Sequence, residues 1–113
     1  MSEKNDSVFI HHMLDSINAI EDFSIGLSKK ELVTNRLKQS AIVREIEVIG
    51  EAAKNLSKTF KNKHNAIAWK DIIGTRDIII HRYFGVDLDV VWNIITADLP
   101  KLKKQLGKIV TKG

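Results

Sequence analysis

Four side chains that could do chemistry lie within residues 76–83, the stretch RDIIIHRY. Arg76 offers a planar, permanently charged fork that can bind two phosphate oxygens. His81 can take up or release a proton near neutral pH, because an imidazole titrates at about pH 6.5 in water. Asp77 could orient that imidazole, and Tyr83 adds a hydroxyl close by. The set suits phosphodiester chemistry in which the 2′-hydroxyl of RNA is the nucleophile, and this chemistry needs no metal ion.

On a helix, these four side chains would share one side. With about 100° of rotation per residue, Arg76 and Tyr83 lie within about 20° of each other, and Asp77 and His81 within about 40°. Arg76 and His81 are about 140° apart, so the four groups cover one broad side near a helix end. A structural role fits the same pattern, as a surface Arg–Asp pair, a half-buried histidine and an interfacial tyrosine. Spacing alone does not decide between a reactive site and a covered turn.

The chain has 113 residues, of which 43% are hydrophobic, and it contains no cysteine. This length is typical of one domain, so we expect residues 1–113 to form a single folded unit that could gain stability by pairing with a second copy. The lack of cysteine excludes disulfides and thiolate metal sites. No apolar run approaches the roughly 18 residues of a membrane span, and residues 1–25 do not resemble a signal peptide. We therefore expect a cytoplasmic protein that does not enter a membrane.

The net charge of +4 comes from the C-terminal end, where five lysines follow Pro100 with no acid among them. A basic segment attracts polyanions such as RNA. A solvated lysine face on a final helix explains the same run without a partner, and it is the favoured interpretation for the tail taken alone.

The spacing of the apolar residues predicts an all-α protein. One proline, six glycines and few β-branched alternations argue against strands. Apolar residues recur at helical spacing in a first helix of about residues 7–24, whose start Ser7 or Asp6 could cap. The segment SIGLS then interrupts the pattern before the next helix.

Ser28 and Glu31 have the spacing of a capping box, which opens a long second helix of about residues 29–58. Its apolar stripe advances by four and three residues in turn, as expected for a helix that packs on another helix. The polar stretch KTFKNKHNAIA, residues 58–68, lacks a regular period and predicts a loop. This loop would lead to the segment that carries the reactive side chains.

That segment belongs to a third predicted helix, over about residues 69–82. Asp87 or Asp89 would cap a fourth helix. Pro100 lies inside the fourth helix and cannot donate the helical hydrogen bond, so we expect a kink there or a fresh start capped by Asp98. Together these helices predict an all-α, four- to five-helix up-down bundle with mostly antiparallel neighbours.

The sequence also resembles a known family. RDIIIHRY has the pattern Arg, four residues, His, one residue, Tyr, which is similar to the motif of HepT-like proteins in the HEPN superfamily of small helical domains. REIEVIGEAAKNLS (44–57) resembles the family's second-helix signature, and AWKDIIGTRDIIIHRYFGVDLDVVWNIITADLP (68–100) resembles its long downstream block. Two long blocks in the right order are far more specific than eight residues, and the resemblance covers most of the chain.

The resemblance implies a helical bundle that dimerises through its helices, with the Arg/His motif in a cleft at the shared interface. HepT-like proteins are ribonucleases that lack a bound metal or other cofactor and act as the toxin of a two-gene toxin–antitoxin system. Their partner, a minimal nucleotidyltransferase, inactivates the toxin by attaching AMP to the motif's tyrosine. Carried over by position, Arg76 and His81 would be the catalytic pair and Tyr83 the modified residue. The substrate would be RNA, with transfer RNA as one candidate.

The chain departs from the family pattern at two positions. Asp77 stands where asparagine is frequent, and Arg82 stands where an acid commonly separates the histidine from the tyrosine. Asp77 keeps a polar side chain beside the site as a supporting residue, and Arg82 adds positive charge that could bind RNA. Glu51 could support the same site from the second helix, with Gly50 permitting close helix contact, or it could pair at the surface.

The remaining histidines and the tryptophans carry little functional signal. His11 and His12 are adjacent and so lie about 100° apart on a helix, which is poor geometry for a shared metal ion, and we expect them to be solvated. Trp69 and Trp92 occupy helical core positions, so we expect core packing for both in place of base stacking.

Two functions from different classes fit these observations. The leading interpretation is a metal-independent endoribonuclease. The alternative is a non-catalytic helical subunit that presents nucleotide or substrate to a nucleotidyltransferase, with the Arg–His pair binding a phosphate without hydrolysis. Turnover of RNA separates the two.

Overall fold

The computed structural model describes residues 3–80 and 87–112, and within these ranges it does not describe the side chains of residues 3, 4, 76, 78–80, 111 and 112. His81, Arg82 and Tyr83 therefore lie outside the described residues. Neither described range contains a strand, which agrees with the predicted all-α class. The elements are α1 (Glu3–Phe23), α2 (Lys29–Thr34), α3 (Arg36–Lys54), α4 (Lys58–Lys63), α5 (Trp69–Ile80), α6 (Leu88–Asn93), the π-helical turn η1 (Ile94–Asp98) and α7 (Leu99–Lys112).

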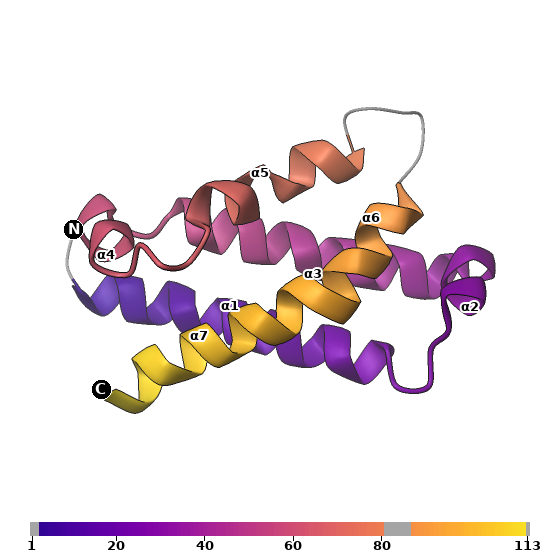
Figure 1. Ribbon diagram of the computed structural model, residues 1–113, viewed down its shortest axis with the longest axis horizontal. Coiled ribbons are helices and arrows are strands. Elements are labelled where there is room, and N and C mark those ends of the chain that lie inside the picture. The colour runs from indigo at the N-terminus through magenta and orange to yellow at the C-terminus, as the bar shows by residue number, and fades with distance from the viewer. Residues whose placement is uncertain (1–2, 81–86, 113) are drawn as a thin grey trace.

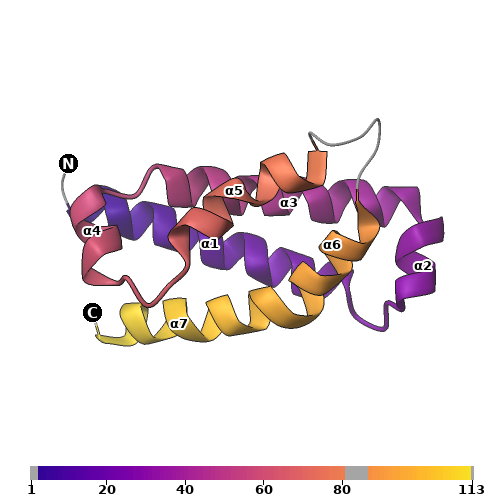
Figure 2. The ribbon, with the colours of Figure 1, turned by 45° about the horizontal axis from the view of Figure 1, so that its top comes forward.

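Three long helices form a layer, and a fourth covers one of its faces. α1, α3 and α5 lie side by side with α3 in the middle and running antiparallel to both neighbours, as Figure 1 shows. Figure 2, turned by 45°, separates α7 from this layer and shows it on one side only. The core lies between the layer and α7, and its most deeply buried side chains include Ile10, Met13, Ile17, Ile42, Ile46, Ile49, Leu102 and Leu106.

The start of α1 differs from the prediction. The helix begins at Glu3, so neither Ser7 nor Asp6 caps it. Asp6 is instead buried, and its carboxylate accepts hydrogen bonds from the backbone N–H and the hydroxyl of Ser57, both at 2.7 Å. Ser57 is the N-cap of α4, so Asp6 ties the start of α1 to a segment 51 residues away.

The turn after α1 agrees with the prediction. Gly26 has φ of 69°, a left-handed conformation that costs glycine little. The capping box at Ser28 is confirmed: the Glu31 N–H donates to the Ser28 hydroxyl at 3.1 Å, and the Ser28 N–H donates to the Glu31 carboxylate at 3.3 Å. Both orphan N–H groups at the start of α2 thereby gain a partner.

The predicted second helix is interrupted. Asn35 ends α2 and also caps α3, where its side chain accepts from the Lys38 N–H at 3.0 Å. The amide of Gln39 donates to the carbonyl oxygens of Leu32 and Val33 at 2.8 and 2.9 Å, which gives carbonyls at the end of α2 a partner. The segment predicted as one helix over residues 29–58 therefore forms two helices, and the stripe of Ile42, Ile46, Ile49 and Ala53 lies on α3 alone.

The predicted loop at residues 58–68 is partly wrong, because its first six residues form α4. Ser57 caps α4 by accepting from the Phe60 N–H at 3.1 Å. The Phe60 ring lies 6.1 Å from the Trp69 ring, and the Trp69 indole N–H donates to the His64 carbonyl at 3.0 Å. Trp69 is buried, so the prediction that it packs in the core is confirmed.

The sequence predicted a kink at Pro100 or a fresh start capped by Asp98, and the structure has a π-helical turn just before the proline. The Leu99 N–H donates to the Ile94 carbonyl, five residues back, in η1. Pro100 has no N–H, and its ring would crowd the carbonyl of Thr96 in a regular α-helix, which a wider turn relieves. Asp98 lies within η1, and it is Asp87, as predicted, that caps the fourth helix, accepting from the Val90 N–H at 3.2 Å.

The basic C-terminal segment forms the outer side of α7. Leu102 and Leu106 are buried, whereas Lys101, Lys104 and Lys108 are exposed. Lys103 forms an ion pair of 2.8 Å with Glu21 of α1. Among the described helices, none combines the length and the apolar character that crossing a bilayer requires.

Candidate active site

The reactive side chains predicted from the sequence fall at the end of α5. Arg76 and Asp77 lie in its last two turns, and the Asp77 side chain is exposed. His81, Arg82 and Tyr83 follow directly outside the described residues, so their predicted roles remain predictions. The position of the site in the fold is therefore set by how α5 is held against its neighbours.

Gly50 sets the register between α3 and α5. A Cβ atom added there would lie 3.4 Å from the carbonyl oxygen of Ile72 and 3.8 Å from that of Ile73. The predicted close helix contact at Gly50 is thus confirmed, with backbone of α5 directly against α3. Because α3 and α5 are antiparallel (Figure 1), moving one turn toward the start of α3 corresponds to one turn toward the end of α5.

This register places Glu47 of α3 at the level of Arg76. Glu47 precedes Gly50 by three residues, and Arg76 follows Ile73 by three, so both lie about 5 Å along the helices from the close contact. Around the axis of α5, Arg76 falls between the directions of Ile72 and Ile73, about 40° from the first and 60° from the second. Position 76 therefore lies on the side of α5 that faces α3, at the level of Glu47.

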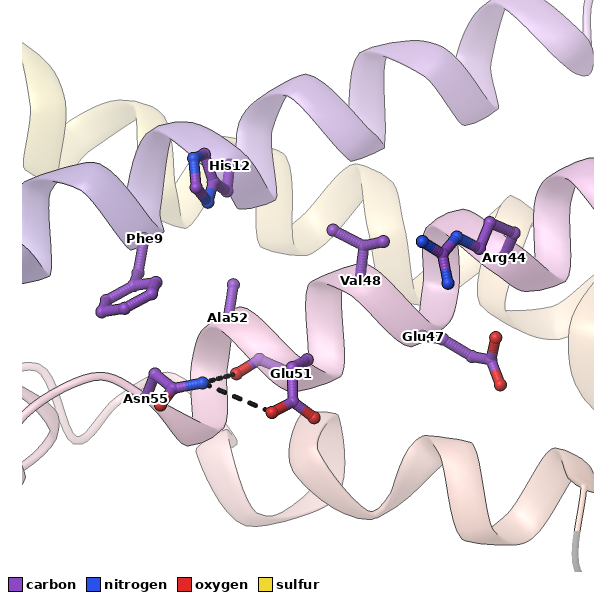
Figure 3. Close-up of a pocket in the computed structure, with 8 residues that line it drawn as sticks. All are labelled: Phe9, His12, Arg44, Glu47, Val48, Glu51, Ala52 and Asn55. Carbon is purple, nitrogen blue, oxygen red and sulfur yellow. Dashed lines mark hydrogen bonds between the residues drawn. The ribbon is translucent and has the colours of Figure 1, made fainter.

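A pocket of about 360 Å³ opens on the face of the layer that α7 does not cover, and we call it the outer pocket. Figure 3 views it with α1 above, α3 in the middle, α5 below and α7 behind. Glu51 lines it, as do a phenylalanine and a histidine of α1 and an arginine and a second glutamate of α3. Its full lining is Phe9, His12, Arg44, Glu47, Val48, Glu51, Ala52 and Asn55.

The outer pocket has an aromatic end and a cationic end. Figure 3 shows Phe9 beside Ala52 and Asn55 at one end and Arg44 at the other. The Asn55 amide N–H donates to the Glu51 carbonyl at 2.8 Å and more weakly to the Glu51 carboxylate at 3.5 Å. The side-chain amide of Asn55 therefore donates to Glu51 of the same helix. Its side-chain carbonyl oxygen is the acceptor that it can offer a ligand.

The histidines of α1 behave differently from each other. Both are exposed, as predicted. The Nδ1 atom of His11 lies 2.8 Å from the carbonyl oxygen of Ser7, whereas the ring of His12 packs edge-on against Phe9 with 6.2 Å between centroids. In the part of the chain that the structure describes, no group of three or more His, Cys, Asp or Glu side chains is arranged to hold a metal ion.

A second hollow, of about 260 Å³, lies on the other side of α5, and we call it the inner hollow. Buried Ile46 and Ile49 of α3 line it, together with Ile94 of η1 and Leu102 of α7. Thr75 of α5 lies at this hollow, and its hydroxyl donates to the Asp71 carbonyl at 2.7 Å. α5 thus packs mainly against α3, with a hollow between it and α7.

The fold and the site define a small all-α bundle with a mixed-charge pocket between α1 and α3. The family described as "Ribonuclease HepT-like" matches residues 13–109. The chain therefore belongs to the HepT-like ribonuclease family of the HEPN superfamily, as the sequence motifs indicated.

Named relatives agree with this assignment. The chain is 35% identical over 101 residues to "Probable ribonuclease HepT" of Thermococcus cleftensis, covering 89% of this chain and 92% of the relative. It is 38% identical over 104 residues to "Putative RNase" of Caldanaerobacter subterraneus subsp. tengcongensis, covering 92% and 93%. No solved structure matches the chain significantly.

One relative is about twice as long. The chain is 41% identical over 107 residues to "Gamma-glutamylcyclotransferase and putative RNase" of Methanocaldococcus jannaschii, covering 95% of this chain but only 48% of the relative. The chain thus spans about half the length of that protein, whose name describes two activities.

Proposed function

We propose that this protein is a metal-independent endoribonuclease with Arg76 and His81 as its catalytic pair. The observation that carries the proposal is the family match over residues 13–109, which contains the whole segment 76–83. The contact at Gly50 supports it, because that contact holds α5, whose last turns carry Arg76, against α3.

The proposed reaction uses the 2′-hydroxyl of RNA as nucleophile. His81 accepts the proton of the 2′-hydroxyl, the oxygen attacks the adjacent phosphorus, and the bond from phosphorus to the 5′-oxygen breaks. The leaving 5′-oxygen takes a proton from water and His81 returns its proton to the solvent, so the products carry a 2′,3′-cyclic phosphate and a 5′-hydroxyl. Arg76 binds the phosphate with two parallel hydrogen bonds and stabilises the charge that develops on it.

Three further residues support this site in the proposal. Asp77 orients the imidazole of His81 from the same helix. Glu51 lines the outer pocket on the neighbouring helix α3, and Arg82 adds a positive charge for the RNA backbone. Two copies of the chain form a homodimer through their helices, with the two motifs facing a shared cleft.

Turnover in a chelator tests the ribonuclease. Purified protein in excess EDTA is expected to cleave transfer or messenger RNA into fragments with 2′,3′-cyclic phosphate ends, which end-specific labelling detects. The His81→Ala protein, purified in parallel, controls for contaminating nucleases. Absence of cleavage by both proteins would favour a non-catalytic nucleotide-binding subunit, and fragments with 3′-hydroxyl ends would contradict the reaction proposed here.

The proposal also includes control of the toxin by a minimal nucleotidyltransferase antitoxin that attaches AMP to Tyr83. Seven residues separate Tyr83 from Arg76, so an adenylyl phosphate there would neutralise the guanidinium that otherwise binds the substrate. Mass spectrometry after incubation with the transferase and ATP is expected to find one adenylyl group on Tyr83 and a matching loss of cleavage. An unmodified Tyr83, with cleavage unchanged, would exclude this regulation.

A further inference from the structure

The outer pocket combines an apolar wall with hydrogen-bond acceptors. Val48 and Ala52 of α3 line its base between the two helices, and the half-buried ring of Phe9 stands at one end. A volume of about 360 Å³ falls in the range of roughly 300–1,000 Å³ that small-molecule sites occupy. A flat heteroaromatic ring that stacks on Phe9 is the ligand shape that this end of the pocket fits.

Two polar groups of α3 at this end of the pocket, Glu51 and Asn55, offer hydrogen-bond acceptors to a ligand, while His12, whose ring packs against Phe9, can donate or accept. Glu51 offers a carboxylate with about four lone-pair sites, of which Asn55 occupies one at 3.5 Å. Asn55 directs its N–H groups at Glu51 and leaves its carbonyl oxygen for a ligand. A ring that bonds to both oxygens of the Glu51 carboxylate must therefore present two adjacent N–H donors.

Arg44 supplies hydrogen-bond donors and a positive charge at the end of the outer pocket away from Phe9. It lies seven residues before Glu51, two turns along the same face of α3, or about 10 Å away. An exposed guanidinium at this distance from a base suits the phosphate of the same or the next nucleotide.

We propose that the outer pocket binds a guanosine nucleotide, with guanine at Phe9 and Glu51 and its phosphate at Arg44. Guanine carries an N1–H and an N2 amino group side by side, and these can donate to the two oxygens of one carboxylate in charge-assisted hydrogen bonds. Adenine and cytosine present one amino group next to a ring-nitrogen acceptor, and uracil presents one N–H between two carbonyls. Each would set an acceptor against the acceptor-only carboxylate.

Glu47 relates the pocket to the end of α5. It lines the pocket, and the contact at Gly50 places it at the level of Arg76 along the two helices. If the chain cleaves RNA as proposed above, on which this step rests, the bound guanosine is a nucleotide of the substrate close to the scissile phosphate. The ribonuclease would then prefer cleavage sites near guanosine.

An NMR titration of the full chain with GMP, AMP, CMP and UMP tests the pocket directly. GMP is expected to bind at least about tenfold more tightly than AMP and to shift the backbone amide signals of Phe9, Val48 and Ala52. Glu51→Gln is expected to bring the GMP and AMP affinities together. Arg44→Ala is expected to bind GMP no better than guanosine while keeping the preference for guanine.

Glu45→Gln is the matched control, because Glu45 lies on the same helix outside the pocket. The proposal would be overturned by equal affinities for the four nucleotides, by signal shifts elsewhere in the chain, or by a guanine preference that survives Glu51→Gln. Absence of binding because a second copy of the chain covers the pocket would also overturn it. The titration needs no turnover, so an inactive ribonuclease would not affect its result. Cleavage without a guanosine preference would contradict the guanosine site alone.

Discussion

Replacing Arg76 with alanine is expected to lower the rate of RNA cleavage by a factor on the order of a hundred to a thousand. In the proposed reaction, Arg76 is the group that binds the scissile phosphate and stabilises its developing charge. Arg76→Lys keeps the charge but loses the planar fork, so it is expected to recover only part of the rate. Initial rates on one labelled RNA, measured at equal protein concentration, give the comparison.

Lys70→Ala is the matched control for this experiment. Lys70 is an exposed cation in the first turn of the same helix, so removing it changes the net charge by the same amount. Its effect is expected to be small and to shrink further in added salt, because a distant surface charge acts only through screened attraction. Cleavage by Arg76→Ala at the wild-type rate, with its helical circular dichroism intact, would remove Arg76 from the mechanism.

The long helices could be predicted from the sequence because their apolar residues repeat at helical spacing. The break at Asn35 was not predicted, although the apolar stripe begins only at Ile42. An asparagine inside a helix costs only a few tenths of a kcal/mol more than most residues, so its presence did not indicate a helix end. The amide of Gln39 donates to carbonyl oxygens at the end of α2 and so satisfies acceptors that the break leaves free. Such contacts cannot be read from periodicity.

The errors at Asp6 and α4 have a common origin in tertiary structure. Asp6 looked like a helix cap because aspartate near a helix start usually is one. Its partner is Ser57, 51 residues later, and helix packing brings the two together. α4 has few apolar residues of its own, and the contact of Phe60 with Trp69 supplies what its local pattern lacks.

The candidate site could be predicted only along α5. Residue types, spacing and the family motif pointed to Arg76 and His81, whose roles stay predictions, and Glu51 was considered as a supporting or surface-paired residue of the second helix. Arg44 and Glu47 were missed because a charged residue on the surface of a helix has no distinguishing sequence pattern. One signal was present: Gly50 within the apolar second helix indicated a close helix contact, and counting one turn back from it would have reached Glu47.

The contact at Gly50 predicts a second large effect. Gly50→Leu is expected to destabilise the protein by about 2 kcal/mol, within the range for overpacked cores. The Cβ atom alone would lie 3.4 Å from the Ile72 carbonyl oxygen, so the remaining side-chain atoms have to displace the backbone of α5. Since the inner hollow lies between α5 and α7, little else restrains α5 on that side. Chemical denaturation measures the loss of stability.

The same substitution is expected to lower RNA cleavage more than tenfold, because α5 carries Arg76 and small misplacements of catalytic groups are costly. Gly50→Ala separates the displacement of α5 from the loss of the glycine itself. The single Cβ of alanine nearly fits at this position, and alanine favours a helix by about 1 kcal/mol over glycine. Gly107→Leu in α7 is the control, because a Cβ added there meets nothing within 4 Å. If Gly50→Leu were as stable as Gly107→Leu and cleaved RNA at the wild-type rate, the contact between α3 and α5 would not position the site.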